Sequence, residues 1–208
     1  MNRTTILTAL TAVALAGVTA SLATASSAGK HTDRFSYRHV DAIVLDNSQG
    51  HVHITAGNSK SVTVERTAQT LFTKTTSSAH LSGHFLHLGS RCHGTVCQVD
   101  YRINTPAGVR LQITQENATV SIVGTPGNLA VTNTDEGDLT FDLTRAPQHL
   151  RASTHNGGVD ITVPHGSYTV TARASDGNKT IAGITVNPRA QHTLHVSADS
   201  GDITINGR

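Results

Sequence analysis

Near the end of the chain stands Ser197-Ala198-Asp199-Ser200-Gly201-Asp202-Ile203-Thr204-Ile205, and the same pattern occurs repeatedly upstream. Apolar residues alternate with polar ones, a short polar turn carries a glycine, and the alternation then resumes. Alternation at period two turns one face of a strand inward, so the stretch predicts a strand, a turn and a second strand.

Six copies of this unit align on the turn residue, which is Gly50, Ala118, Gly137, Gly157, Gly177 or Gly201. The last five turn positions are 19 to 24 residues apart, a period that is typical of stacked repeat architectures. Residues two and four places after the turn are mostly apolar, as Val159 and Ile161 are. We expect the turn glycine to supply a positive φ.

The repeat predicts an all-β protein with a β-solenoid or β-helix-like body, because no single unit can bury its apolar face alone. An antiparallel β-sandwich of hairpins would give the same alternation and is the alternative. Aromatic residues are only 3% of the chain and tryptophan is absent. This composition suits a thin interior built of Val, Ile, Leu and Ala.

Residues 1–25 have the features of a secretory signal peptide. Arg3 precedes an apolar run from Ile6 to about Ala23, and small residues follow it. We expect cleavage after Ala25 or, as a second choice, after Ala28. An uncleaved membrane anchor is the alternative, which the high Ala and Thr content of the run disfavours.

Residues 26–34 are small and polar and are expected to form a flexible leader. Residues 35–208 then make one domain. The net charge of the chain is only +2, so no strong field attracts nucleic acid. We therefore expect no nucleic-acid partner, and no membrane span once the signal peptide is removed.

The interval between the turns at Gly50 and Ala118 is longer than one repeat and predicts an inserted hairpin. Its two strands would flank the segment from Cys92 to Cys97. A disulfide between these two cysteines is expected, because an even cysteine count in an exported chain favours pairing. Closing so short a loop contributes about 2 kcal/mol on the chain-entropy model.

The cysteine pair and the run Cys97-Gln98-Val99-Asp100-Tyr101-Arg102-Ile103-Asn104-Thr105-Pro106-Ala107-Gly108-Val109, followed by Gly-Asp-Leu and Gly-Asp-Ile units, resemble the putative-adhesin family of bacterial exported β-strand-repeat domains of unknown function. The resemblance covers roughly residues 35–208. It implies an all-β, repeat-built surface or secreted protein and brings no catalytic residues. The chain departs from the family pattern at two turns. Ala118 stands in place of the turn glycine, and Asn178-Lys179 stands where the family tends to have Asp and an aliphatic residue.

Histidine is abundant, with 13 residues in the chain. His51 and His53 would point to the same side of a strand, and His84 and His87 lie in a second histidine-rich segment. These four are weak candidates for a transition-metal site. Solvated histidines on a strand face are the alternative and the one we favour, because the spacing matches no known metal motif, and we expect no cofactor.

Carboxylates gather at the predicted turns, namely Asp135, Glu136, Asp138, Asp160, Asp176, Asp199 and Asp202. Stacked along one edge, they could bind calcium or act as an acid and base on a polysaccharide. Alternatively, aspartate favours turns because its side chain bonds the nearby backbone. The sequence contains no nucleophile elbow and no phosphate-binding glycine loop, so we predict no catalytic residue.

The sequence thus predicts an exported, secreted or cell-surface, non-catalytic binding or structural module. It would recognise cell-envelope polysaccharide or a surface protein along a flat, Thr- and Asp-rich strand face. A carbohydrate-active enzyme on a β-helix and a metal-binding envelope protein are the alternatives. A final unit that ends openly at Gly207-Arg208 would also invite edge-to-edge self-association.

Overall fold

A computed structural model describes residues 25–26, 29–70, 74–93 and 96–208. All regular elements in these ranges are β-strands. The predicted signal peptide, residues 1–25, falls outside the described ranges except for its last residue. None of the described residues belongs to a helix that could span a membrane.

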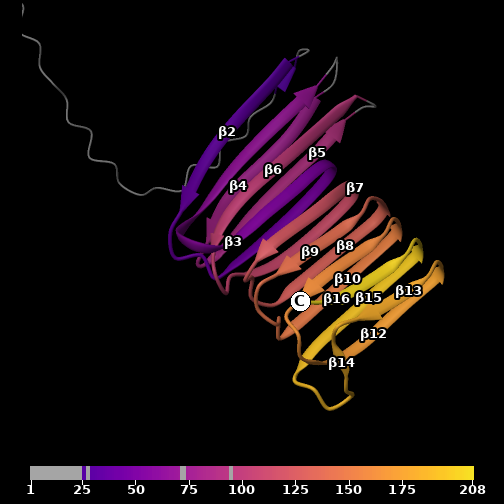
Figure 1. Ribbon diagram of the computed structural model, residues 1–208. Helices are drawn as coiled ribbons and strands as arrows, with labels where there is room; N and C mark the ends of the chain where they lie inside the picture. Colours follow the sequence, from indigo (N-terminus) through magenta and orange to yellow (C-terminus); the bar gives the residue numbers. More distant parts are fainter. Residues whose placement is uncertain (1–24, 27–28, 71–73, 94–95) are drawn as a thin grey trace, which may run out of the picture.

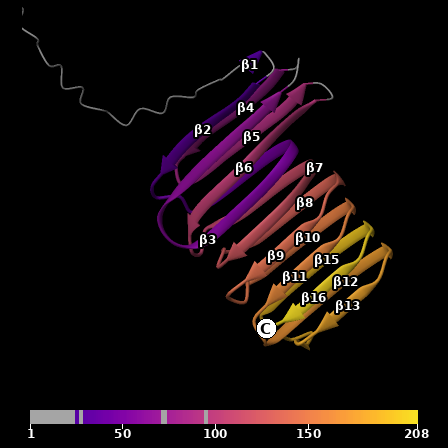
Figure 2. The same cartoon turned by 45° about the horizontal axis from the view of Figure 1, so that its top comes forward.

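The strands in these ranges form two facing layers, which we call layer A and layer B (Figures 1 and 2). In chain order they are β1 Ala25–Ser26, β2 Gly29–Tyr37, β3 Ala42–Thr70, β4 Lys74–Ser82, β5 Phe85–His93, β6 Cys97–Pro106, β7 Arg110–Gly124, β8 Leu129–Glu136, β9 Leu139–Leu143, β10 His149–Asn156, β11 Val159–Val163, β12 Ser167–Asp176, β13 Lys179–Ala182, β14 Thr185–Val186, β15 His192–Ser200 and β16 Ile203–Gly207.

The long strands β3 and β7 bend at Gly50 and Ala118 and so belong to both layers. Layer A has the order β1, β4, β5, residues 42–49 of β3, residues 110–117 of β7, β8, β10, β15, β12 and β14. Layer B has the order β2, residues 62–70 of β3, β6, residues 52–57 of β3, residues 118–124 of β7, β9, β11, β16 and β13. From residues 42–57 of β3 onward the neighbouring strands are parallel, so the solenoid prediction is confirmed.

Equivalent residues of successive rungs stack in register between the layers. In layer B, for example, Ile54, Ile122, Phe141, Ile161 and Ile205 form one continuous row. Each of them is at most 1% exposed. Burying one such side chain contributes about 1.5–3 kcal/mol, so the stacked rows supply most of the stabilisation.

The turn glycines form a column in which each rung touches the next. A Cβ atom at Gly157 would lie 2.3 Å from the carbonyl oxygen of Gly137, and one at Gly201 would lie 2.1 Å from that of Gly157. Gly157 and Gly201 also have φ values of +147° and +140°, as predicted. Gly177 is different, because its φ lies outside the left-handed region. It is glycine because a Cβ would lie 2.1 Å from the Gly201 carbonyl oxygen.

The last rung in the sequence is not the last rung in space. Strand β15 lies between β10 and β12, and β16 lies between β11 and β13 (Figure 2). The predicted open edge at Gly207-Arg208 is therefore wrong, and the rung of β12 and β13 ends the stack. All four residues of β13 are exposed, which explains why Lys179 occupies a position that is aliphatic elsewhere.

The opposite end of the stack is closed by antiparallel strands. The expectation of a flexible leader at residues 26–34 is wrong from Gly29 onward, because these residues form β2 and pair with residues 62–70 of β3. Asp33 Oδ2 lies 2.6 Å from Nη2 of Arg66, whose side chain is only 3% exposed. The Arg66 guanidinium also lies 5.2 Å from the centre of the Phe35 ring. This long-range pairing orders the segment.

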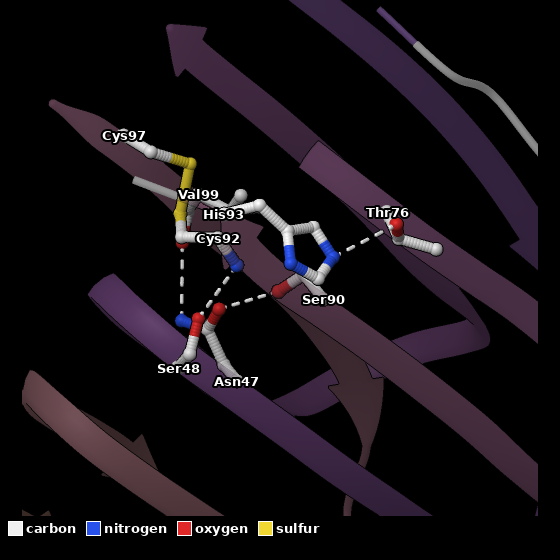
Figure 3. Close-up of a disulfide and its surroundings, with 8 residues drawn as sticks. All are labelled: Asn47, Ser48, Thr76, Ser90, Cys92, His93, Cys97 and Val99. Carbon is white, nitrogen blue, oxygen red and sulfur yellow. Dashed lines mark hydrogen bonds between the residues drawn. A yellow bond between two sulfur atoms is a disulfide. The ribbon is translucent and has the colours of Figure 1, made fainter. Parts of the chain in front are cut away.

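An inserted hairpin is present, but it is formed by β4 and β5. The prediction pairs the strand before Cys92 with the strand after Cys97, which are β5 and β6. Strand β5 continues layer A, whereas β6 lies in layer B. The disulfide between Cys92 and Cys97, with Cα atoms 5.6 Å apart, therefore joins the two layers (Figure 3). Beside it, the Cys92 N–H donates to Ser48 Oγ and the Asn47 amide donates to the Val99 carbonyl oxygen.

Replacing Gly157 by alanine should lower the free energy of unfolding by about 2–4 kcal/mol, since the new methyl group meets the Gly137 carbonyl at an unfavourable φ. Urea unfolding of the two proteins measures the difference. Gly57→Ala is the matched control, because no atom lies within 4 Å of a Cβ built at Gly57. Equal losses in the two variants would contradict the role of the glycine column.

Replacing Asp33 by asparagine should destabilise the chain by about 2 kcal/mol at pH 7, because the buried Arg66 loses its partner. Burial raises the pKa of Asp33, but the hydrogen bond and charge of Arg66 outweigh it, so the pKa lies below its ordinary value. Charged Asp33 therefore stabilises the fold above about pH 4, and this contribution is lost as the pH falls through the lowered pKa.

Urea unfolding at pH 7 and pH 3 tests this expectation. The stabilities of the wild type and of Asp33→Asn should approach each other at pH 3, while Asp41→Asn, at an exposed pair with His84, should have little effect at either pH. A difference that stays constant between the two pH values would contradict the role of the Asp33 carboxylate.

Candidate functional site

The four candidate metal-binding histidines do not converge on one site. His51 and His53 lie on the part of β3 that belongs to layer B, whereas His84 and His87 lie in the hairpin of layer A. Across the part of the chain that the structure describes, no group of three or more His, Cys, Asp or Glu side chains could hold a metal ion.

Each of these histidines has a local contact instead, and for His53 it is the Thr55 hydroxyl, 3.4 Å from Nε2. His51 Nδ1 lies 3.2 Å from Asp100 Oδ1, and His84 Nδ1 lies 3.0 Å from Asp41 Oδ2. The rings of His87 and His80 stack with their centres 4.9 Å apart. These are the contacts of histidines on a strand face.

Asp100 on layer B has a pKa that its surroundings lower. Burial raises the pKa of Asp100, but hydrogen bonds from the Gln98 amide and from the backbone N–H and ring of His51 outweigh it and hold the pKa below its usual value. The carboxylate therefore stays charged and fixes the orientation of His51. This contact orders β3 against β6.

Two of the turn carboxylates bond the backbone of the neighbouring rung. The N–H of Gly158 donates to Asp138 Oδ1 at 2.8 Å, and the N–H of Asn178 donates to Asp202 Oδ1 at 2.8 Å. In the Gly-Asp pair of the repeat, the glycine allows neighbouring rungs to approach closely. The aspartate accepts a hydrogen bond from a backbone N–H of the adjacent turn. Asp199, by contrast, pairs with His155 on layer A at 2.8 Å.

A groove of about 610 Å³ runs along the turns of four successive rungs. Its floor is formed by the turn residues, and its polar lining includes Gln49, Gln98, Glu136, Asp138 and Asn156. Because Asp138 already accepts a backbone N–H, part of this lining serves the rung contact. The groove is present because the glycine and alanine residues at the turns have little or no side chain to fill it.

A second groove, of about 520 Å³, lies on the outer face of layer A, and we call it the layer A groove. Its lining combines small or apolar residues with cationic and polar ones. The residues on which its properties depend are Ala42, Val44, Phe85, Arg110, Ala130, His149, Arg151 and His195. The lining contains no Asp or Glu.

The charges on layer A are distributed unevenly. Arg91 binds Asp46 and Glu116, each at 2.7 Å, on the side of the face nearer the turns. Arg110 and Arg151 are exposed, and among the described residues neither forms an ion pair. The Arg110 guanidinium lies 5.5 Å from the centre of the Phe85 ring, which holds it beside the groove.

The outer face of layer B carries rows of short polar side chains. Ser121, Thr140, Asp160, Thr204 and Thr180 lie in register on five neighbouring strands. Adjacent strands in a sheet are about 4.8 Å apart, so the row repeats at that interval. This is the Thr- and Asp-containing strand face expected from the sequence.

Sequence reasoning missed the layer A groove because its lining comes from six strands, β3, β5, β7, β8, β10 and β15. A signal was nevertheless present. Arg151 and His195 occupy the same outward position in two repeat copies, one place before Ala152 and Val196. Aligning the outward positions of the copies, as well as the inward ones, would have grouped these two residues.

The model of a protein family described as Toastrack DUF4097 matches residues 100–206. Within the solved structures, a putative cell adhesion protein from Clostridium sporogenes ATCC 15579 has a TM-score of 0.57 at 11% identity, over 86% of this chain and 100% of that one. A putative adhesin from Bacteroides fragilis NCTC 9343 has a TM-score of 0.37 at 14% identity, over 88% and 98%. At 11% identity the likeness to the Clostridium sporogenes protein concerns the fold alone.

No curated protein matches the chain significantly. The matches that do exist confirm the resemblance to adhesin-like strand-repeat domains that the sequence indicated.

Replacing Asp202 by alanine should lower the unfolding free energy by about 1–2 kcal/mol, because the Asn178 N–H loses its acceptor. Thermal melting of the wild type should be the same with calcium and with a chelator. Asp160→Ala, at an exposed position of β11, is the matched control and should melt like the wild type. A calcium-dependent rise in melting temperature that Asp202→Ala abolishes would instead identify a calcium site at the turns.

Proposed function

The chain belongs to the Toastrack DUF4097 family, and from this premise we propose that it is an exported, non-catalytic binding module that attaches to cell-envelope polysaccharide through an outer strand face. The observation that carries the proposal is the in-register repetition of outward polar side chains, such as Thr140, Asp160 and Thr204. A polymer with its own repeat contacts several rungs at once, and such multiple contacts raise the overall affinity well above that of each one.

Export is supported by two independent features of the chain. Residues 1–25 have the sequence pattern of a secretory signal peptide. Cys92 and Cys97 form a disulfide, and structural disulfides persist in oxidising compartments outside the cytosol. Together they favour a location at the cell surface or in the surrounding medium.

The absence of catalysis is part of the proposal, and the turn carboxylates are its main support. Asp138 and Asp202, two of the turn carboxylates that a glycosidase could use as an acid and a base, accept backbone N–H groups of neighbouring rungs. A carboxylate held in this way stabilises the stack.

The test is co-sedimentation of the purified mature protein with isolated cell envelope and with insoluble wall polysaccharide. We expect saturable binding that a chelator does not change, with no sugar released into the supernatant. The heat-unfolded protein is the control for adsorption.

Other outcomes would replace the proposal by a named alternative. Release of sugar would make the protein a carbohydrate-active enzyme, and loss of binding with chelator would make it a metal-dependent envelope protein. Binding that protease treatment of the envelope abolishes would identify a surface protein as the partner.

A further inference from the structure

We propose that the layer A groove binds a linear acidic polysaccharide, with the guanidinium groups of Arg110 and Arg151 pairing with carboxylates of its uronic acid units. The proposal rests on the proposed function and adds to it a class of polysaccharide and a second contact, on the face opposite to the polar rows of layer B. Arginine suits this task, because its planar fork of N–H donors matches the two oxygens of a carboxylate.

The positions of the two arginines fit an extended polymer. Leu111, Leu129 and Leu150 form one row across β7, β8 and β10, and Arg110 precedes this row whereas Arg151 follows it. From the usual strand spacing and rise, their backbone positions are about 12 Å apart, on a diagonal across three strands. A linear polymer with a charge on every unit or every second unit can place one carboxylate at each arginine.

Three acidic side chains around the groove are engaged by other side chains. Arg91 binds Asp46 and Glu116 on the side nearer the turns, and Asp41, which precedes Ala42, lies 3.0 Å from Nδ1 of His84. Arg110 is in addition held against the Phe85 ring, which limits the side-chain entropy that binding would otherwise cost. The groove therefore presents partly ordered cations to an anionic ligand.

The apolar part of the groove favours a sugar polymer over other polyanions. Phe85 is 44% exposed beside the cations, and the small side chains of Ala42 and Ala130 leave room above the sheet. Ligand sites typically combine such apolar walls with a few placed polar groups, and the C–H faces of sugar rings pack against them. Nucleic acid presents its phosphates outward, and a chain of net charge +2 attracts it weakly.

The experiment measures the affinity of the full mature chain for polygalacturonate, with neutral dextran and duplex DNA as comparison polymers. The double variant Arg110→Gln/Arg151→Gln should bind polygalacturonate about tenfold more weakly or worse. The matched control Lys60→Gln/Lys179→Gln removes the same charge from exposed positions outside the groove and should bind like the wild type. Melting curves establish that all variants are folded.

Each remaining outcome is decisive. Unchanged binding of polygalacturonate by the arginine variant, or no binding by the wild type, would overturn the site. DNA binding of equal strength that also depends on the two arginines would overturn the assignment to a polysaccharide. If the arginine variant binds polygalacturonate as the wild type does while the wild type sediments with cell envelope, this inference fails and the proposed function stands. If the wild type does not sediment with envelope, the proposed function itself fails.

Discussion

The close approach of each turn glycine to the carbonyl oxygen of the next rung is the contact on which the whole stack depends. At Gly157 and Gly201 no side chain would fit between the rungs. Because every rung bends at the same point and at the same distance from its neighbour, the strands on both sides of the turn meet in register. The continuous inward rows and the repeating outward rows are both consequences of that single alignment.

The two outer faces differ even though the same repeat builds them. From β7 onward, the outer face of layer B carries mostly short hydroxyl and carboxylate side chains, such as Thr140, Asp160 and Thr204, whereas the layer A groove is lined by arginines, histidines and Phe85. The inward positions are constrained by packing, so they vary little from rung to rung. The outward positions are free of that constraint, and differences in binding chemistry between the faces therefore arise there without any cost to the core.

The repeat made the rungs and their inward residues predictable, because alternation and the turn glycine are local signals, and the even cysteine count made the disulfide predictable. The order of the rungs was not predictable, since the pattern around Gly201 does not encode which rung it stacks against. Lys179, at a position that is aliphatic in the other rungs, was the visible sign that its rung ends the stack. Strand β2 was missed because the Asp33–Arg66 contact links residues 33 positions apart. The layer A groove was missed because it is assembled from six strands.

Because β15 and β16 are inserted between two earlier rungs, the stack cannot assemble in the order in which the chain is synthesised. The rung of β12 and β13 gains its permanent neighbour only after residues 192–207 have been made, so the order of synthesis cannot be the order of stacking. The free end of the stack is therefore formed by an internal segment of the sequence, residues 167–186.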